Sequence, residues 1–265
     1  MSNLDPTLPR TSRAPSLSAV VITRNEAHNL DDCLATLTGW VDEIVVVDSH
    51  SSDDTVAIAQ RHGAKVAQPE GWPGFGPQKN RALDLATCDW VLSIDADERV
   101  PPALAQEIRH ALAHGSEGLA YDIPRLSWYC GKFIRHAGWR PDHVLRLFPR
   151  RHARFSDDLV HERVVTDLPR KQLHNDLLHY SYRDFSQVLA KVDAYSSASA
   201  RQAVARGKRA TVGSAVGHGA WAFFRTYVLR AGFLDGGHGL ALAISNAETS
   251  YYKYLKIWAL QQPQP

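Results

Sequence analysis

Cysteine is scarce in this sequence of 265 residues, and a long apolar stretch is missing. The 3 cysteines lie far apart and form no C-x-x-C pair, which argues against a disulfide framework or a structural zinc site and favours a reducing cytosol. No stretch approaches the ~20 apolar residues that a membrane-spanning helix requires. The nearest candidate, residues 221–234, is interrupted by Arg225 and Arg230. We therefore expect a protein that is soluble or peripheral to a membrane.

A dominant charge of one sign is also missing, but the charges are unevenly distributed. The 30 Lys and Arg residues against 28 Asp and Glu residues give a formal net charge of +2, with His neutral. Residues 1–120 contain 9 basic and 17 acidic residues, a balance of −8, whereas residues 121–265 contain 21 and 11, a balance of +10. The composition, 44% hydrophobic and 22% charged, is that of a globular protein, so disorder is excluded. Because the two halves of the sequence have opposite net charges, we expect them to bind different kinds of partner.

The first half alternates between apolar runs and helical patterns. Strands are predicted at residues 17–23, 43–48, 64–67 and 90–95, and helices at 55–62, at 78–86 and from Pro101. Apolar runs of this kind are typical of strands buried on both faces. The sequence therefore predicts an α/β fold, an open and mostly parallel sheet with helices on both faces. Residues 1–16 are expected to be a flexible tail, and residues 69–77, rich in Pro and Gly, a loop.

The pattern of apolar and polar residues changes after Gly118. Short β-like runs at residues 119–123, 144–148 and 177–180 are followed by helical patterns at 185–206, 220–230 and 240–260. Glycines punctuate these helical patterns. We expect an α/β domain over residues 17–180 and a C-terminal helical region over residues 181–265.

Polar and acidic side chains follow three of the predicted strands. The strand ends carry Thr23-Arg24-Asn25-Glu26, Asp48-Ser49-His50-Ser51 and Asp95-Ala96-Asp97. Ligands of open α/β sheets bind at the carboxyl ends of the strands. Two carboxylates two residues apart can meet Mg²⁺ or Mn²⁺, although they could also be helix-entry carboxylates before Pro101. Asp48 could accept hydrogen bonds from a nucleobase or ribose, or belong to the cap of the next helix.

These segments together resemble the family 2 glycosyltransferases, which have the GT-A fold and bind a nucleotide-sugar. The resemblance covers about residues 17–165 and is carried by the strand ends and by Gln78-Lys79-Asn80-Arg81. Three further segments are similar to the subgroup that adds glucose to a heptose of the lipopolysaccharide inner core: Trp72 to Arg81, Leu145-Arg146-Leu147-Phe148 and Val160-His161-Glu162.

The resemblance implies a role for each matching residue. Thr23, Glu26 and Asp48 would hold the uracil and ribose of a UDP-sugar, with Asn25 and Ser51 as further donor-binding residues. Lys79 would face the diphosphate, and Asp95 would lie near the ribose. Asp97 would hold Mg²⁺ or Mn²⁺, which assists departure of UDP. His161 could complete the metal site, unless it is a surface or packing histidine. Glu162 would be the general base, with Asp157 and Asp158 as rivals.

The resemblance implies an inverting, metal-dependent transferase that moves a sugar, expected to be glucose, to a heptose of the lipopolysaccharide inner core. Residues 17–118 would bind the nucleotide-sugar, and residues 119–180 would face the acceptor. Two alternatives stay open: transfer to polyprenyl phosphate or another envelope glycan, and a catalytically silent protein that binds sugar nucleotides.

The basic second half suggests a negatively charged acceptor and a membrane surface. Arg146, Arg150, Arg151, Arg154 and Arg163 are expected on the acceptor side, and four basic residues follow between residues 201 and 209. They would attract an anionic lipid-linked oligosaccharide and an anionic leaflet, unless they form a solvated helix face. Aromatic residues at 221–234 could form an interfacial helix or pack against the sheet domain. No nucleic-acid-binding module is recognised. We expect a cytoplasmic protein peripheral to the inner membrane.

Overall fold

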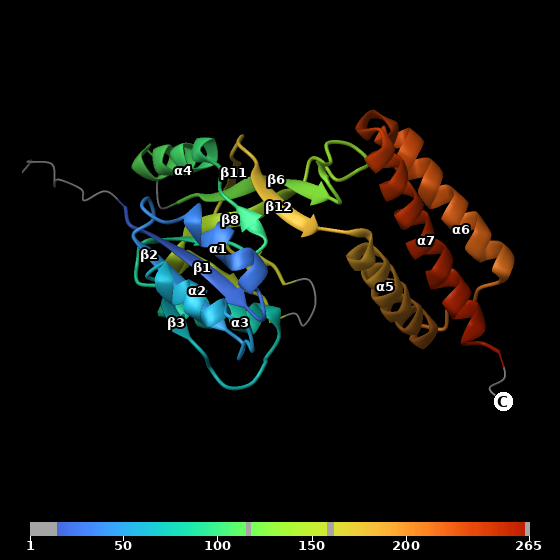
Figure 1. Ribbon diagram of the computed structural model, residues 1–265, viewed down its shortest axis with the longest axis horizontal. Helices are drawn as coiled ribbons and strands as arrows, with labels where there is room; N and C mark the ends of the chain where they lie inside the picture. The colour runs from blue at the N-terminus through green and yellow to red at the C-terminus, as the bar shows by residue number, and fades with distance from the viewer. Residues whose placement is uncertain (1–14, 115–117, 158–161, 263–265) are drawn as a thin grey trace, which may run out of the picture. The chain divides into compact units, whose positions relative to one another are not determined.

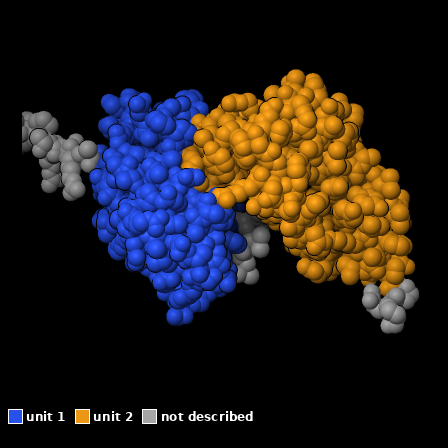
Figure 2. Space-filling model, in the orientation of Figure 1, with its two compact units in different colours: residues 1–96, 100–123, 145–175 blue, residues 97–99, 124–144, 176–265 orange. Residues whose placement is uncertain are grey.

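The computed structural model describes residues 15–114, 118–157 and 162–262 (Figure 1). The chain divides into two compact units, coloured separately in Figure 2. Unit 1 comprises Met1–Ala96, Val100–Ile123 and Leu145–Asn175, and unit 2 comprises Asp97–Arg99, Pro124–Val144 and Asp176–Pro265. Residues 1–14 of the expected tail lie outside the described residues. The functional boundary expected after residue 180 stays a prediction.

Unit 1 is an α/β structure built on a mostly parallel sheet. Its strand order is β3-β2-β1-β4-β8-β6, with β11 paired to β6. The pairs β1–β2, β1–β4 and β2–β3 are parallel, whereas β4–β8 is antiparallel. The elements are β1 (Leu17–Thr23), α1 (Ala27–Ala35), β2 (Glu43–Asp48), α2 (Thr55–Arg61), β3 (Lys65–Ala67), α3 (Phe75–Leu85), β4 (Trp90–Ser93), α4 (Pro102–His114), β6 (Ala120–Tyr129), β8 (His143–Pro149), η1 (Arg150–His152), β9 (Arg154–Phe155), β10 (Val164–Val165) and β11 (Arg170–Gln172). Strands β6 and β8 each contribute residues to both units.

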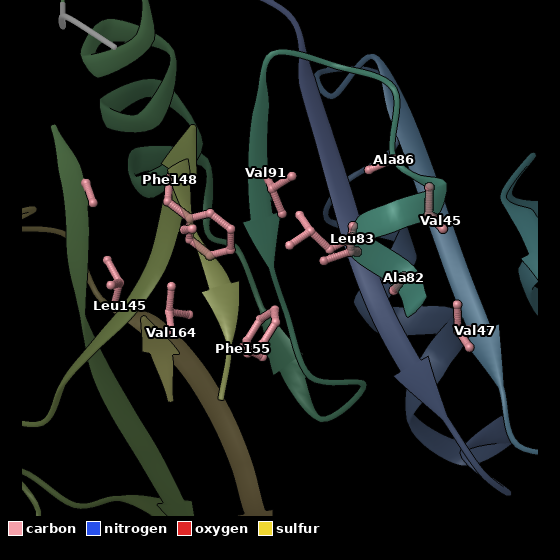
Figure 3. Close-up of a cluster of buried hydrophobic side chains, with 13 residues drawn as sticks. Val45, Val47, Ala82, Leu83, Ala86, Val91, Leu145, Phe148, Phe155 and Val164 are labelled. Atoms are coloured by element: carbon pink, nitrogen blue, oxygen red, sulfur yellow. The ribbon is translucent and has the colours of Figure 1, made fainter. Parts of the chain in front are cut away.

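The core of unit 1 explains why its strands read as continuous apolar runs. Successive side chains of a strand point to opposite faces of the sheet. Val45 and Val47 of β2 belong to a buried cluster with Ala82 and Leu83 of α3 (Figure 3). Val46, between them, is also fully buried, so the opposite face of the strand is covered as well. The predicted α/β class is confirmed.

Unit 2 combines short strands with a helical region. Strand β12 (Leu177–Tyr182) pairs with β6 in parallel and with β5 (Glu98–Arg99) antiparallel, and β7 (Lys132–Phe133) pairs with β6. Helix α7 packs against both α5 and α6 (Figure 1). The helical elements are α5 (Phe185–Ala205), α6 (Val212–Phe224), a π-helical turn η2 (Arg225–Leu229), a 3₁₀ turn η3 (Gly232–Asp235) and α7 (Gly237–Ala259).

Three helices begin earlier than the sequence predicts: α3, α6 and α7, the last of which begins at Gly237 rather than at residue 240. Helix α3 begins at Phe75 because Pro77, which has no backbone N–H, is tolerated in the first helical turn, where backbone N–H groups have no partner within the helix. Helix α6 begins at Val212 rather than at residue 220, behind a capping box of Thr211 and Ser214. The glycines of α6 do not break the helix. A Cβ at Gly219 would lie 3.1 Å from the Tyr251 Cβ, so this glycine allows α6 to approach α7 closely.

Candidate active site

The end of β2 presents a buried carboxylate that is held on all sides. Asp48 is fully buried, and its Oδ1 accepts hydrogen bonds from the hydroxyls of Thr23 (2.9 Å) and Ser51. Its Oδ2 accepts from the Ser51 amide (2.9 Å) and from Gln68 Nε2 (2.9 Å). Asp48 therefore fastens the ends of β1 and β2 and the segment after β3 to one another, and it does not act as a simple helix cap.

Two loops at this edge are joined by side chains that the sequence predicts to bind a nucleotide. The backbone N–H of Asn25 donates to Ser51 Oγ (2.8 Å). The side-chain oxygen of Asn25, Oδ1, accepts from the backbone N–H of Ser52 (2.8 Å). Asn25 and His50 both adopt left-handed backbone conformations, with φ of 54° and 55°. Glu26 accepts from Asn29 Nδ2 (2.9 Å) and lies at the start of α1. Thr23, Asn25, Glu26, Asp48 and Ser51 therefore form one connected edge of the sheet.

Four consecutive residues of α3 connect this edge to the rest of unit 1. Gln78 donates to Ser49 Oγ (3.1 Å), while Arg81 donates to the carbonyls of Glu70 and Gly71. Asn80 bonds both the amide and the carbonyl of Phe155, each at 2.9 Å. Three of the four side chains thus fix the loops around α3. The remaining side chain, Lys79, is held between two carboxylates.

The Lys79 ammonium is buried and lies 3.0 Å from Asp95 Oδ1 and 2.9 Å from Glu162 Oε1. Arg146, also buried, is ion-paired with the other oxygen of Asp95. Burial of the Asp95 carboxyl acts to raise its pKa, but the charges of Arg146 and Lys79 outweigh burial and hold that pKa well below its usual range. The structure thus brings Lys79, Asp95 and Glu162 together, with Asp95 ionised.

The segment that carries Glu162 approaches the start of α3 closely. A Cβ at Gly76 would lie 1.8 Å from the Ser156 carbonyl oxygen and 3.4 Å from the Glu162 Cβ. Such a separation is impossible without movement of the backbone. Only glycine therefore permits this approach, which brings Glu162 within reach of Lys79.

Asp97, the second aspartate of the segment Asp95-Ala96-Asp97, has a partner that the sequence does not indicate. Asp97 Oδ2 lies 3.3 Å from His179 Nε2, within unit 2. The other ring nitrogen of His179 is 3.0 Å from Ser127 Oγ, which fixes the orientation of the ring. His179 follows Leu177-Leu178 in an apolar run that was predicted as a strand. The sequence therefore places His179 on a strand. It does not indicate the pairing with Asp97, because the two residues come together only in the folded protein.

Other predicted residues lie elsewhere. His161 and Asp158 lie outside the described residues, and Asp157 is exposed. Three arginines expected to face the acceptor have partners within the protein: Arg146 with Asp95, Arg150 with the Cys88 carbonyl and Arg154 with Asp84. Among residues 15–114, 118–157 and 162–262, no group of three or more His, Cys, Asp or Glu side chains could hold a metal ion.

Comparison with known proteins shows which family the chain matches. Residues 18–167 match the profile described as Glycosyl transferase family 2. An uncharacterized glycosyltransferase of Rickettsia felis is 32% identical over 252 residues, which cover 91% of this chain and 89% of the relative. The lipopolysaccharide core biosynthesis glycosyltransferase LpsC of Rhizobium meliloti is 30% identical over 257 residues, covering 91% and 92%.

Solved structures show similarity over part of the chain. The crystal structure of S. aureus TarS 1-349 is 18% identical, with a TM-score of 0.47, and the match covers 63% of this chain and 60% of that one. The family assignment depends on the sequence profile and the relatives. The chain therefore belongs to Glycosyl transferase family 2, and it is a glycosyltransferase with a GT-A-like fold and C-terminal helices.

Proposed function

We propose that this glycosyltransferase moves a glucose unit, with inversion, from UDP-glucose to a heptose of the lipopolysaccharide inner core. The observation that carries the chemistry is the position of the Lys79 ammonium between Asp95 and Glu162 (3.0 and 2.9 Å). The acceptor class is supported by the relative LpsC, which is described as acting in lipopolysaccharide core biosynthesis.

The connected edge at the ends of β1 and β2 would hold the nucleoside. Asp48 is fully buried and its carboxylate already accepts four hydrogen bonds within the protein, so it would hold Thr23 and Ser51 in position for the nucleoside rather than contact the nucleoside itself. Asn25, Glu26 and Ser51 belong to the same edge, and Asp95 would lie near the ribose. Lys79 would bind the diphosphate, because an ammonium in the first turns of a helix faces phosphate together with the helix N-terminus.

Glu162 would be the general base of a single displacement. The acceptor hydroxyl gives its proton to the Glu162 carboxylate as its oxygen attacks the anomeric carbon. The bond from that carbon to the diphosphate breaks, and UDP leaves with the bonding electrons. In the structure Glu162 is paired with Lys79. A bound diphosphate would compete for the ammonium, so that donor binding would release the Glu162 carboxylate for the acceptor.

Asp97 and His179 would hold Mg²⁺ or Mn²⁺. Their ligand atoms lie 3.3 Å apart, and an imidazole and a carboxylate fit a divalent cation that completes its coordination with phosphate oxygens. When bound, the cation supplies Lewis-acid stabilisation of the negative charge on the departing UDP. His179 replaces His161 in this proposal. Ser127 would orient the His179 ring, since a partner on one ring nitrogen fixes which nitrogen faces the metal.

Unit 2 would contact the membrane that contains the acceptor. Trp221, Phe224, Leu229, Phe233 and Leu234 are each 45–59% exposed. Arg201, Arg206, Lys208 and Arg209 are also exposed, and each would contribute about 1 kcal/mol near an anionic surface. Among the described helices, none has the length and apolar character to cross a bilayer.

Sedimentation of the protein with anionic vesicles tests this membrane contact. We expect the binding to be salt-sensitive and to be lost when the four basic residues are replaced with Gln. Equal binding to anionic and to neutral vesicles would refute electrostatic attraction to the membrane.

The substrates can be tested by a transfer assay with Mn²⁺, UDP-glucose and heptosylated lipid A, with product detected by mass spectrometry. We expect a product heavier by one hexose, and slow release of UDP from UDP-glucose without acceptor. Polyprenyl phosphate serves as the comparison acceptor, and other UDP-sugars as comparison donors. Transfer to polyprenyl phosphate alone would reject the heptose acceptor. UDP binding without hydrolysis or transfer would identify a silent binding protein.

A further inference from the structure

Unit 2 contains a cavity of about 370 Å³. Of the residues that line it, only His179 has a role in the proposed reaction. We name it the aromatic pocket; its lining includes Arg125, Trp139, Asp142, His179, Tyr182 and Lys191. Cavities of roughly 300–1,000 Å³ with a few fixed polar groups are typical small-molecule sites.

One wall of the aromatic pocket is a pair of stacked rings. The Trp139 and Tyr182 ring centroids lie 5.9 Å apart with an interplanar angle of 27°. Tyr129, buried beneath them, meets each ring edge-on at 5.7 Å and restrains both. Burial raises the pKa of Tyr182 to about 12, so its hydroxyl stays neutral. Aromatic faces are electron-rich and attract the polarised C–H bonds on the flat side of a pyranose ring.

The polar groups of the pocket are fixed and of both signs. Arg125 donates to Asp142 Oδ2 from Nε (2.9 Å) and from its second terminal nitrogen (2.8 Å), and it lies 3.6 Å from Glu98. The Lys191 ammonium lies 4.3 Å from the Tyr182 ring centroid. The two cations are therefore offset by the carboxylates of Asp142 and Glu98. An anionic ligand would gain little here, whereas sugar hydroxyls can donate to carboxylates and accept from cations.

We infer that the aromatic pocket is a subsite for an uncharged pyranose, which stacks on Trp139, itself supported by the Tyr182 ring, and hydrogen-bonds to Arg125 and Asp142. The assignment of that sugar to the acceptor rests on the proposed function. It is supported by His179, which lines the pocket and also contacts Asp97 (3.3 Å), so an occupant of the pocket lies beside a residue proposed to hold the metal.

The test is saturation-transfer NMR on the full chain, without donor or metal, using methyl α-D-glucopyranoside and methyl α-D-mannopyranoside as probes. At least one glycoside should bind, and Trp139→Leu should weaken its binding at least fivefold. Trp139→Phe, which keeps an aromatic face, should bind within twofold of the wild type. Trp258→Leu, at an exposed tryptophan of α7 outside the pocket, is the matched control.

A second pair, Tyr182→Leu and Tyr182→Phe, serves if Trp139→Leu fails to fold, as judged by circular dichroism. No binding by either glycoside, or equal binding by the Leu and Phe variants, would overturn the inference. Glucose 6-phosphate binding tenfold more tightly than the glycosides would overturn the preference for an uncharged ligand. The assay involves no transfer, so glycoside binding without transfer would refute only the proposed function, and transfer without pocket binding would refute only the subsite.

Discussion

Lys79 and Glu162 form an ion pair in the interior of unit 1, with 2.9 Å between Nζ and Oε1. The same ammonium contacts Asp95 at 3.0 Å, so one cation neutralises parts of two carboxylates from distant segments of the chain. We therefore expect Lys79 to have two functions: it connects Asp95 to Glu162, and it would bind the donor diphosphate. The two functions can be separated by measuring stability and kinetics on the same variant.

Lys79→Met should impair both properties. The thioether keeps the length of the side chain but leaves Asp95 and Glu162 without their shared cation, so we expect a loss of roughly 1–3 kcal/mol in the free energy of unfolding. Loss of the charge that faces the diphosphate should lower kcat/KM by roughly 10²–10³-fold. Urea denaturation and initial rates measure the two effects. Lys65→Met, at an exposed lysine of β3, is the control; a Lys79→Met enzyme with normal kcat/KM would refute the diphosphate contact.

Gly76→Ala should displace the segment that carries Glu162. The added Cβ would lie 1.8 Å from the Ser156 carbonyl oxygen, and backbone movement should cost about 1–3 kcal/mol of stability. We expect kcat to fall at least tenfold. Gly217→Ala in α6, where no atom lies within 4 Å of the new Cβ, should instead raise stability by about 0.5–1 kcal/mol. Thermal denaturation of both variants tests the contrast, and changes of the same sign would contradict it.

The lowered pKa of Asp95 predicts how stability depends on pH. Because the folded-state pKa lies below the ordinary value of 3.8, ionised Asp95 stabilises the protein above that value, and the stabilisation is lost as pH falls through the folded-state pKa. Asp95→Asn should therefore lower the free energy of unfolding at pH 7 and flatten its decline below about pH 4. Denaturation across pH 3–7, with exposed Asp167→Asn as the control, measures this; parallel curves for Asp95→Asn and wild type would contradict it.

The proposed metal ligands can be tested by direct binding. Asp97→Ala and His179→Ala should each weaken Mn²⁺ binding in the presence of UDP by at least about tenfold, as followed by electron paramagnetic resonance. Asp97→Ala should also abolish transfer while the far-ultraviolet circular dichroism stays unchanged. His143→Ala, an exposed histidine at the start of β8, should bind Mn²⁺ as the wild type does. Unchanged Mn²⁺ affinity in His179→Ala would return the metal proposal to Asp97 alone.

The sequence predicts the features of this protein that depend on local pattern. The apolar runs of β1 and β2 and the polar residues after them are local, so the mostly parallel sheet and the family could be recognised. The sequence places the start of α6 too late because Gly219 resembles a helix breaker, whereas in the structure this glycine allows close contact with Tyr251 of α7. Contacts between distant segments had no local signal: Lys79 with Glu162, and Asp97 with His179.

Glu162 is proposed to take the proton of the acceptor hydroxyl, and Glu162→Gln removes the carboxylate that would accept this proton while it keeps the shape of the side chain. The measurement pairs calorimetric binding of UDP with single-turnover transfer from UDP-glucose to heptosylated lipid A, beside the rival carboxylate variant Asp157→Asn. We expect Glu162→Gln to bind UDP within about threefold of the wild type and to lose transfer by roughly 10²–10⁴-fold, whereas Asp157→Asn should retain both UDP binding and transfer. Wild-type transfer by Glu162→Gln, or loss of transfer by Asp157→Asn alone, would contradict it.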